Sequence, residues 1–123
     1  MGKVLVVDDA KIMRANIKKM LTSLGHVIVA EAENGFDAIE KYNVFKPDFV
    51  TMDITMPEKN NIHDGIDAVT GIRIDNPDAK IIMVTSHGEQ DKVIRAVQAG
   101  ALNYILKPIK IDKLEEVLIK HGL

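Results

Sequence analysis

Five short apolar runs alternate along the chain with five longer segments in which apolar residues recur at helical spacing. The short runs are rich in β-branched residues, as strands that are buried on both faces should be. Five strand–helix units predict an α/β fold, a doubly wound five-stranded parallel sheet with right-handed crossovers and helices on both faces. The predicted strands span 4–7, 27–32, 49–52, 81–85 and 102–106, and the helical segments span 12–24, 36–45, 65–75, 89–99 and 111–120.

Residues that favour helix ends separate these segments. Gly25 and Gly100 each follow a helical segment, where a glycine commonly ends the helix. Asn34 precedes the second helical segment. The pair Asn34-Gly35 could also turn a hairpin, but the helical spacing that follows it favours Asn34 as a helix cap.

Composition limits the class of protein. At 123 residues the chain can build one good core, so we expect a single domain over 1–123 with no output domain. A net charge of −2 gives no reason to expect nucleic acid or a membrane as a partner. The absence of cysteine excludes disulfides, zinc–thiolate sites and thiol catalysis. Because no N-terminal signal or long apolar run is present, we expect a cytoplasmic protein.

Three carboxylates follow two of the predicted strands. Asp8 and Asp9 come directly after the first strand, and Asp53 comes directly after the third. In an open parallel sheet, ligands bind at the carboxyl ends of the strands, where the strand order reverses. Three carboxylates gathered there would repel one another unless a hard cation neutralised them, and Mg²⁺ is the natural candidate.

The motifs around these residues resemble those of one family. They are Val-Val-Asp-Asp-Ala-Lys-Ile-Met-Arg at 6–14, Met-Asp-Ile-Thr-Met-Pro at 52–57, Ile-Ile-Met-Val-Thr-Ser at 81–86 and Ala-Gly-Ala-Leu-Asn-Tyr-Ile-Leu-Lys-Pro at 99–108. Together they resemble the response-regulator receiver domain, and in particular the stand-alone CheY-type chemotaxis regulators. The resemblance covers essentially the whole chain, and it implies the strand order 2-1-3-4-5 of flavodoxin-like and CheY-like folds.

This resemblance implies a phosphoacceptor and a metal site. Asp53 would take a phosphoryl group from a kinase phosphohistidine and become an aspartyl phosphate. Asp9 and Asp53 would hold Mg²⁺ together with the backbone carbonyl of Thr55, and Asp8 would act mainly through a metal-bound water.

The resemblance also implies roles for residues near the last two strands. Lys107 would pair with the phosphoryl oxygens, and Thr85 would donate a hydrogen bond to one of them. A lysine and a divalent metal suit phosphoryl transfer, which needs positioning and charge neutralisation more than covalent help. Tyr104 matches the family's switch aromatic, and the Lys107-Pro108 peptide bond would be cis.

Each of these residues also has a simpler interpretation. Asp9 precedes a helix and could be its N-cap, and Asp53 could be a turn residue. Thr85 is a common strand residue, and Lys107 could be a solvated surface charge. Tyr104 could serve core packing. The occurrence of all the polar candidates at the carboxyl ends of strands favours the receiver interpretation.

One segment departs from the family pattern. In the family, a glycine usually lies about eight residues after the phosphoacceptor, whereas Gly65 lies twelve residues after Asp53. About four residues are therefore added within 58–64. Lengthening a surface loop costs little, so we favour a tolerated insertion over a partner contact, but the entry to the third helix becomes uncertain.

The resemblance implies a phosphorylation-dependent regulator that catalyses only its own phosphorylation and dephosphorylation. Its partners would be a CheA-like sensor histidine kinase, a flagellar switch protein or archaeal motor adaptor, and a phosphatase. The alternative is a phosphorelay intermediate that passes its phosphoryl group to another histidine protein. A flavin- or nucleotide-binding protein is disfavoured because Asp-Asp-Ala-Lys stands where a phosphate-binding loop is needed.

Overall fold

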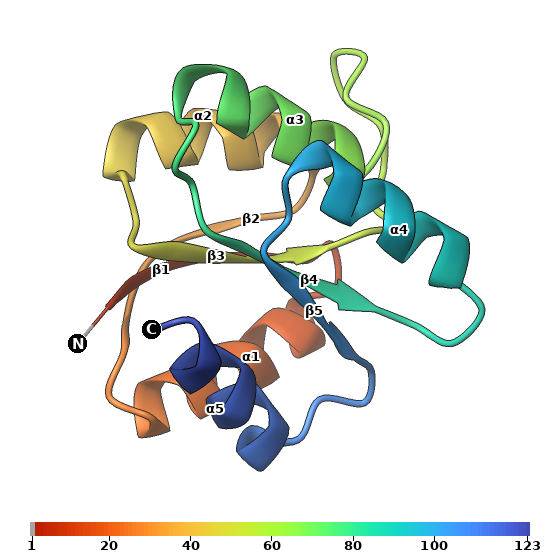
Figure 1. Cartoon of the computed structure of the whole chain (residues 1–123). Helices are drawn as coiled ribbons and strands as arrows, with labels where there is room; N and C mark the ends of the chain where they lie inside the picture. The colour runs from red at the N-terminus through yellow and green to blue at the C-terminus, as the bar shows by residue number, and fades with distance from the viewer. Residues whose placement is uncertain (1) are drawn as a thin grey trace.

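The computed structural model describes residues 2–123 and confirms the predicted α/β fold. Five parallel strands form one sheet in the order β2-β1-β3-β4-β5. Helices α2, α3 and α4 cover one face of the sheet, and α1 and α5 cover the other (Figure 1). The elements are β1 (Lys3–Val7), α1 (Lys11–Ser23), β2 (Val27–Ala32), α2 (Gly35–Phe45), β3 (Phe49–Asp53), α3 (Gly65–Asp75), β4 (Ile81–Thr85), α4 (Gln90–Ala99), β5 (Asn103–Leu106) and α5 (Ile111–Lys120).

The observed bounds differ from the predicted ones by one residue at most. The third strand includes Asp53, which the sequence placed just after it, because Asp53 still pairs with Val84 of β4. The fourth helix begins at Gln90, and Glu89 is its N-cap. The predicted cap of the second helix is confirmed, since Asn34 Oδ1 accepts a hydrogen bond from the Asp37 N–H at 2.9 Å.

Each face of the sheet has its own apolar core. Because successive side chains of a strand point to opposite faces, Val4 and Val6 of β1 face α1 and α5, whereas Leu5 and Val7 face the other helices. The strands are almost completely buried in the middle of the sheet, as the continuous apolar runs predicted. No helix within residues 2–123 is long and apolar enough to cross a membrane.

The strand order reverses between β1 and β3. From β1 the chain crosses to β2 on one side and then returns to β3 on the other side of β1. Val7 of β1 pairs with Met52 of β3, so the residues that follow them emerge side by side. This arrangement creates the crevice at the carboxyl edge of the sheet where ligands of such folds bind.

Candidate functional site

The three predicted carboxylates lie together in this crevice. One carboxylate oxygen of each of Asp8, Asp9 and Asp53 lies within 4.8 Å of the others. Asp8 and Asp53 are buried, whereas Asp9 is exposed. The simpler interpretation of Asp9 as a helix cap is wrong, because the N-cap of α1 is Ala10. Asp8 Oδ1 instead turns toward the chain that follows and accepts a hydrogen bond from the Ala10 N–H at 2.9 Å.

Lys107 brings a positive charge to the cluster from the end of β5. Its Nζ lies 3.4 Å from Asp8 Oδ2 and 3.4 Å from Asp53 Oδ1. The backbone supports this position, because the Lys107 N–H donates a hydrogen bond to the Thr85 carbonyl at 2.7 Å. The Lys107-Pro108 peptide bond is cis, as the family resemblance implied. Lys107 is therefore part of a charged cluster and not a freely solvated surface residue.

The environment of Asp53 disfavours its ionised form. Burial raises the pKa of Asp53 from 3.8 to about 6, and the negative charge of Asp8 adds to this rise while Lys107 opposes it. For Lys107, burial acts to lower the pKa, but the attraction of Asp53 and Asp8 outweighs it, and the pKa is raised. One lysine thus neutralises the cluster only in part, which leaves it short of positive charge.

The oxygen donors fit a hard divalent cation. No hydrogen bond from residues 2–123 reaches the buried Asp8 Oδ2, although Lys107 lies near it. Buried polar atoms are nearly always satisfied, so this oxygen indicates room for a further partner. A cation would satisfy it and relieve the repulsion among three carboxylates. Carboxylate, carbonyl and water oxygens are the ligands that Mg²⁺ prefers.

A further carboxylate, which the sequence did not single out, lies beside this cluster. Glu89 Oε1 accepts hydrogen bonds from the Ser86 N–H at 2.7 Å and from Thr85 Oγ1 at 3.2 Å. Glu89 Oε2 accepts from Thr55 Oγ1 at 2.8 Å. Burial tends to raise the pKa of Glu89, but the bonds from Ser86, Thr55 and Thr85 outweigh it, and the pKa is lowered. Glu89 therefore remains a carboxylate at neutral pH.

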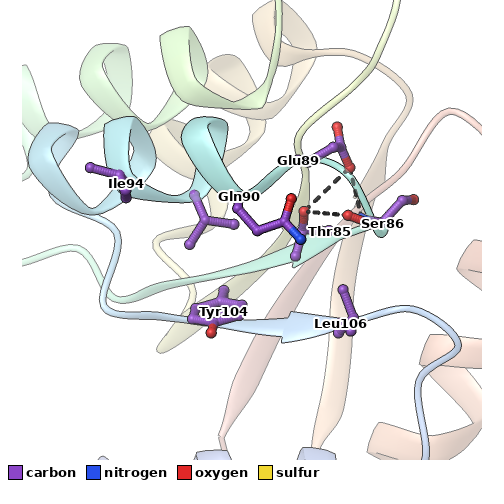
Figure 2. Close-up of a pocket in the computed structure, with 8 residues that line it drawn as sticks. Thr85, Ser86, Glu89, Gln90, Ile94, Tyr104 and Leu106 are labelled. Atoms are coloured by element: carbon purple, nitrogen blue, oxygen red, sulfur yellow. Dashed lines mark hydrogen bonds between the residues drawn. The ribbon is translucent and has the colours of Figure 1, made fainter.

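A hollow of about 330 Å³ opens next to Thr85, between α4 and β5. Figure 2 shows Tyr104 and Leu106 on β5, facing Gln90 and Ile94 across it. Tyr104 is 46 % exposed, so it is not part of the core. The interpretation of Tyr104 as a core-packing residue is therefore wrong for this structure, and the ring has space beside it toward Thr85.

The insertion at 58–64 forms a small hairpin next to α2. Lys59 and Ile62 pair through two backbone hydrogen bonds, and the turn residues Asn60 and Asn61 both have positive φ. Lys59 Nζ lies 2.9 Å from Asp37 Oδ1 and 5.6 Å from the centre of the Phe36 ring. The hairpin is the yellow-green loop that projects beside α3 (Figure 1). The added residues therefore form an ordered hairpin, and the choice between a tolerated insertion and a partner contact stays a prediction.

The hairpin ends in a well-formed start of α3. Asp64 is the N-cap, and its Oδ1 accepts a hydrogen bond from the Asp67 N–H at 2.9 Å. Gly65 lies against the backbone of the site, because its N–H donates to the Ile54 carbonyl at 2.7 Å. A Cβ at position 65 would lie only 2.1 Å from the Asp53 carbonyl oxygen. The glycine thus allows the helix to begin directly behind Asp53 despite the added residues.

Comparisons with known proteins agree with this geometry. The family model of the response regulator receiver domain matches residues 4–119. The chain is 49 % identical over 121 residues to the chemotaxis protein CheY of Thermotoga maritima, covering 98 % of each chain. It is 48 % identical over 118 residues to CheY of Bacillus subtilis, covering 96 % of this chain and 95 % of that one.

Solved structures give the same result. The fold superposes with a TM-score of 0.90 on a chain from the CheX–CheY–BeF₃–Mg²⁺ complex of Borrelia burgdorferi, at 30 % identity. That match covers 98 % of this chain and 89 % of the other. The receiver domain of Thermotoga maritima CheB matches with a TM-score of 0.80 at 34 % identity, covering 97 % of this chain and 91 % of the other.

Proposed function

This chain belongs to the response regulator receiver domain family, and from that premise we propose that it is a chemotaxis regulator that accepts a phosphoryl group on Asp53. As a receiver domain closely related to CheY proteins, it is a signalling regulator and not a classical enzyme. The observation that carries the assignment of Asp53 is its position, buried at the end of β3 beside Asp8 and Lys107.

In the proposed reaction, a phosphoryl group moves from a histidine nitrogen of the kinase to a carboxylate oxygen of Asp53. A carboxylate oxygen of Asp53 attacks the phosphorus of a kinase phosphohistidine, the P–N bond breaks, and the imidazole leaves. Burial makes the Asp53 carboxylate more basic than an exposed aspartate. Lys107 Nζ lies 3.4 Å from Asp53 Oδ1, where it can pair with the incoming phosphoryl oxygens. Water later cleaves the acyl phosphate, so the chain catalyses only its own phosphorylation and dephosphorylation.

Receiver domains bind Mg²⁺ at an acidic pocket, and this chain has the carboxylates for such a site. In our proposal Asp9, Asp53 and the Thr55 carbonyl hold the ion, and Asp8 acts through a bound water. When bound, Mg²⁺ neutralises the negative charge that the phosphoryl group brings to the cluster. Asp8 Oδ2 supports this assignment, because it accepts no hydrogen bond within residues 2–123 and has only an ion pair with Lys107.

Replacing Asp9 tests the metal assignment. Asp9→Ala should weaken Mg²⁺ binding by at least about tenfold. Loss of a residue that only hydrogen-bonds to a metal ligand already weakens metal affinity by about that factor, and Asp9 is proposed as a direct ligand. Calorimetric Mg²⁺ titration measures it. The matched control is Asp75→Ala, which removes an exposed carboxylate from the far end of α3 and should bind Mg²⁺ like the wild type. Equal affinities of the Asp9 variant and the wild type would contradict the assignment.

The partners follow from the same relationship. A solved relative of this chain is the CheY of a CheX–CheY complex. We propose a CheA-like histidine kinase as donor, a flagellar switch protein or archaeal motor adaptor as target, and a CheX-like phosphatase. A pull-down from source cells with phosphorylated and unphosphorylated protein tests this. Preferential capture of motor or adaptor proteins by the phosphorylated form supports the proposal, whereas loss of the phosphoryl group to a histidine protein supports the phosphorelay alternative.

Phosphorylation should change the α4–β5 surface. The Thr85 hydroxyl donates a hydrogen bond to a phosphoryl oxygen, and Tyr104 turns into the hollow beside Thr85. Thr85 and Tyr104 together form a two-state element, and partner affinity depends on which state is populated. Thr85→Ala and Tyr104→Ala should still accept a phosphoryl group but lose most of the gain in partner affinity. The control is Val44→Ala, exposed on α2. An unchanged ratio of affinities in both variants would exclude this route.

Removing the hairpin tests whether it belongs to the reaction site. Because Lys59 and Ile62 are hydrogen-bonded to each other, deleting 59–62 brings together two ends that are already close. The rate of labelling by a small acyl phosphate should stay within about threefold of wild type, because the side-chain contacts of Lys59 are to α2 and not to Asp53. A collapse of labelling in a variant with a normal circular dichroism spectrum would place the hairpin in the site.

A further inference from the structure

The carboxylate of Glu89 joins three segments that meet at the phosphorylation site. It accepts the hydroxyl proton of Thr55 from the loop after β3, the hydroxyl proton of Thr85 from the end of β4, and the N–H of Ser86. Figure 2 shows Glu89 above Thr85 and Ser86 at the start of α4. We call the group formed by Glu89, Thr55, Thr85 and Ser86 the Glu89 clasp.

In the Glu89 clasp, the Thr85 hydroxyl already donates the hydrogen bond that the phosphorylated state requires. A threonine hydroxyl has one proton to donate, and Thr85 directs it to Glu89 Oε1 at 3.2 Å, with the Ser86 carbonyl at 3.4 Å as a weaker acceptor. The proposed function requires the same proton for a phosphoryl oxygen on Asp53. Both bonds cannot exist at once, and Glu89 and the phosphoryl group are both anionic. The two acceptors therefore compete for Thr85.

The position of Glu89 connects this competition to the α4–β5 surface. Glu89 is the N-cap residue of α4, and its carbonyl accepts the Val93 N–H at 3.0 Å. Glu89 and Val93 also line the hollow that faces Tyr104. Movement of the Glu89 carboxylate away from Thr85 would thus change the wall of the hollow at the start of α4.

We propose that Glu89 is an inhibitory positioning residue, which holds Thr85 in the unphosphorylated arrangement until a phosphoryl group on Asp53 displaces it. The inference rests on the proposed function of Asp53. The phosphoryl group gains Thr85 only by breaking the 3.2 Å hydrogen bond to the Glu89 carboxylate, and the net contribution of one hydrogen bond is enough to shift a two-state equilibrium by up to about tenfold. The clasp therefore lowers the population of the active arrangement before phosphorylation.

The test compares Glu89→Ala, Glu89→Gln and wild type without phosphorylation. In Glu89→Ala, the amide resonances of Thr85 and Tyr104 should move toward the positions they take in BeF₃⁻–Mg²⁺-treated wild type. Labelling of Asp53 by a small acyl phosphate should be about tenfold faster. Glu89→Gln keeps a side-chain acceptor for the Ser86 N–H, and should give a smaller change in the same direction. Glu40→Ala, which removes an exposed carboxylate from α2, is the matched control and should change neither readout.

A double-mutant cycle separates the clasp from the general effect of removing a negative charge. In a Thr85→Ala background there is no hydroxyl to release, so Glu89→Ala should accelerate labelling much less than it does in wild type. Equal acceleration in both backgrounds would overturn the proposal, as would slower labelling or unmoved Thr85 and Tyr104 resonances in Glu89→Ala.

Wild type run in parallel tests the proposed function itself. If wild type takes up no phosphoryl group, that function fails, whereas a labelled wild type with unaffected Glu89 variants refutes only the clasp.

Discussion

Incubation with Mg²⁺ and a small acyl phosphate should add one phosphoryl group to the wild-type chain and none to the Asp53→Asn variant. The loss is complete because an amide has no free carboxylate oxygen to attack phosphorus. Intact-mass measurement detects the added group, and its release on mild acid or alkaline treatment identifies an acyl phosphate. Asp75→Asn is the matched control and should be labelled like the wild type, since Asp75 is exposed at the far end of α3. Undiminished labelling of the Asp53 variant would refute the proposed role.

The same variant should be more stable than wild type in a metal chelator, so absence of labelling would not mean absence of folding. The pKa of Asp53 rises from 3.8 to about 6 on folding, which means that the folded state binds this proton more tightly. The free energy of unfolding of the wild type therefore falls as the pH rises from about 4 to 6, because Asp53 must ionise in its buried site. Above about pH 6 this contribution of Asp53 is fully lost. At pH 7.5, Asp53→Asn should raise the free energy of unfolding by about 3 kcal/mol, and the difference should shrink toward pH 4. Urea unfolding at the two pH values measures it.

The main elements could be predicted because the residues that build them also carry a clear local signal. The apolar β-branched runs gave the strands, and Asn34 and Gly100 marked helix ends where the structure has them. Once the sheet was expected to be parallel, its topology brought Asp8 and Asp53 to one edge. The predicted third strand ended one residue too early. Asp53 belongs to β3 because it pairs with Val84, and this pairing depends on the neighbouring strand and not on Asp53 itself.

The Glu89 clasp could not be predicted in this way. Glu89 was visible only as an acidic residue near a helix start, a place where acids are common for local reasons. Its partner Thr55 comes from a loop 34 residues earlier in the chain, and their contact depends on how α4 packs above β4. The contact of Lys59 with Asp37 is of the same kind. Such side-chain contacts between a loop and a helix start that are distant in the sequence have no period or turn signal.

Gly65→Ala should have the largest effect on stability among single-methyl additions near the site. Its Cβ would lie 2.1 Å from the Asp53 carbonyl oxygen and 3.1 Å from the Ile54 Cα, so the backbone of the site itself must move. Overpacking of this kind costs about 3 kcal/mol. Because the displaced atoms belong to the phosphoacceptor, labelling of the remaining folded protein should also slow by more than tenfold, the loss that a shift of about 1 Å can cause.

Gly71→Ala, in the same helix, provides the matched control for this prediction. A Cβ at position 71 would meet Ile39 Cδ1 at 2.4 Å, but that atom is the end of a flexible side chain, and alanine favours the helix by about 1 kcal/mol over glycine. Thermal unfolding should therefore show a large drop for Gly65→Ala and little change for Gly71→Ala. If both variants unfold and accept phosphoryl groups like wild type, then the insertion at 58–64 lets α3 retreat from Asp53, and the glycine does not set the position of the phosphoacceptor.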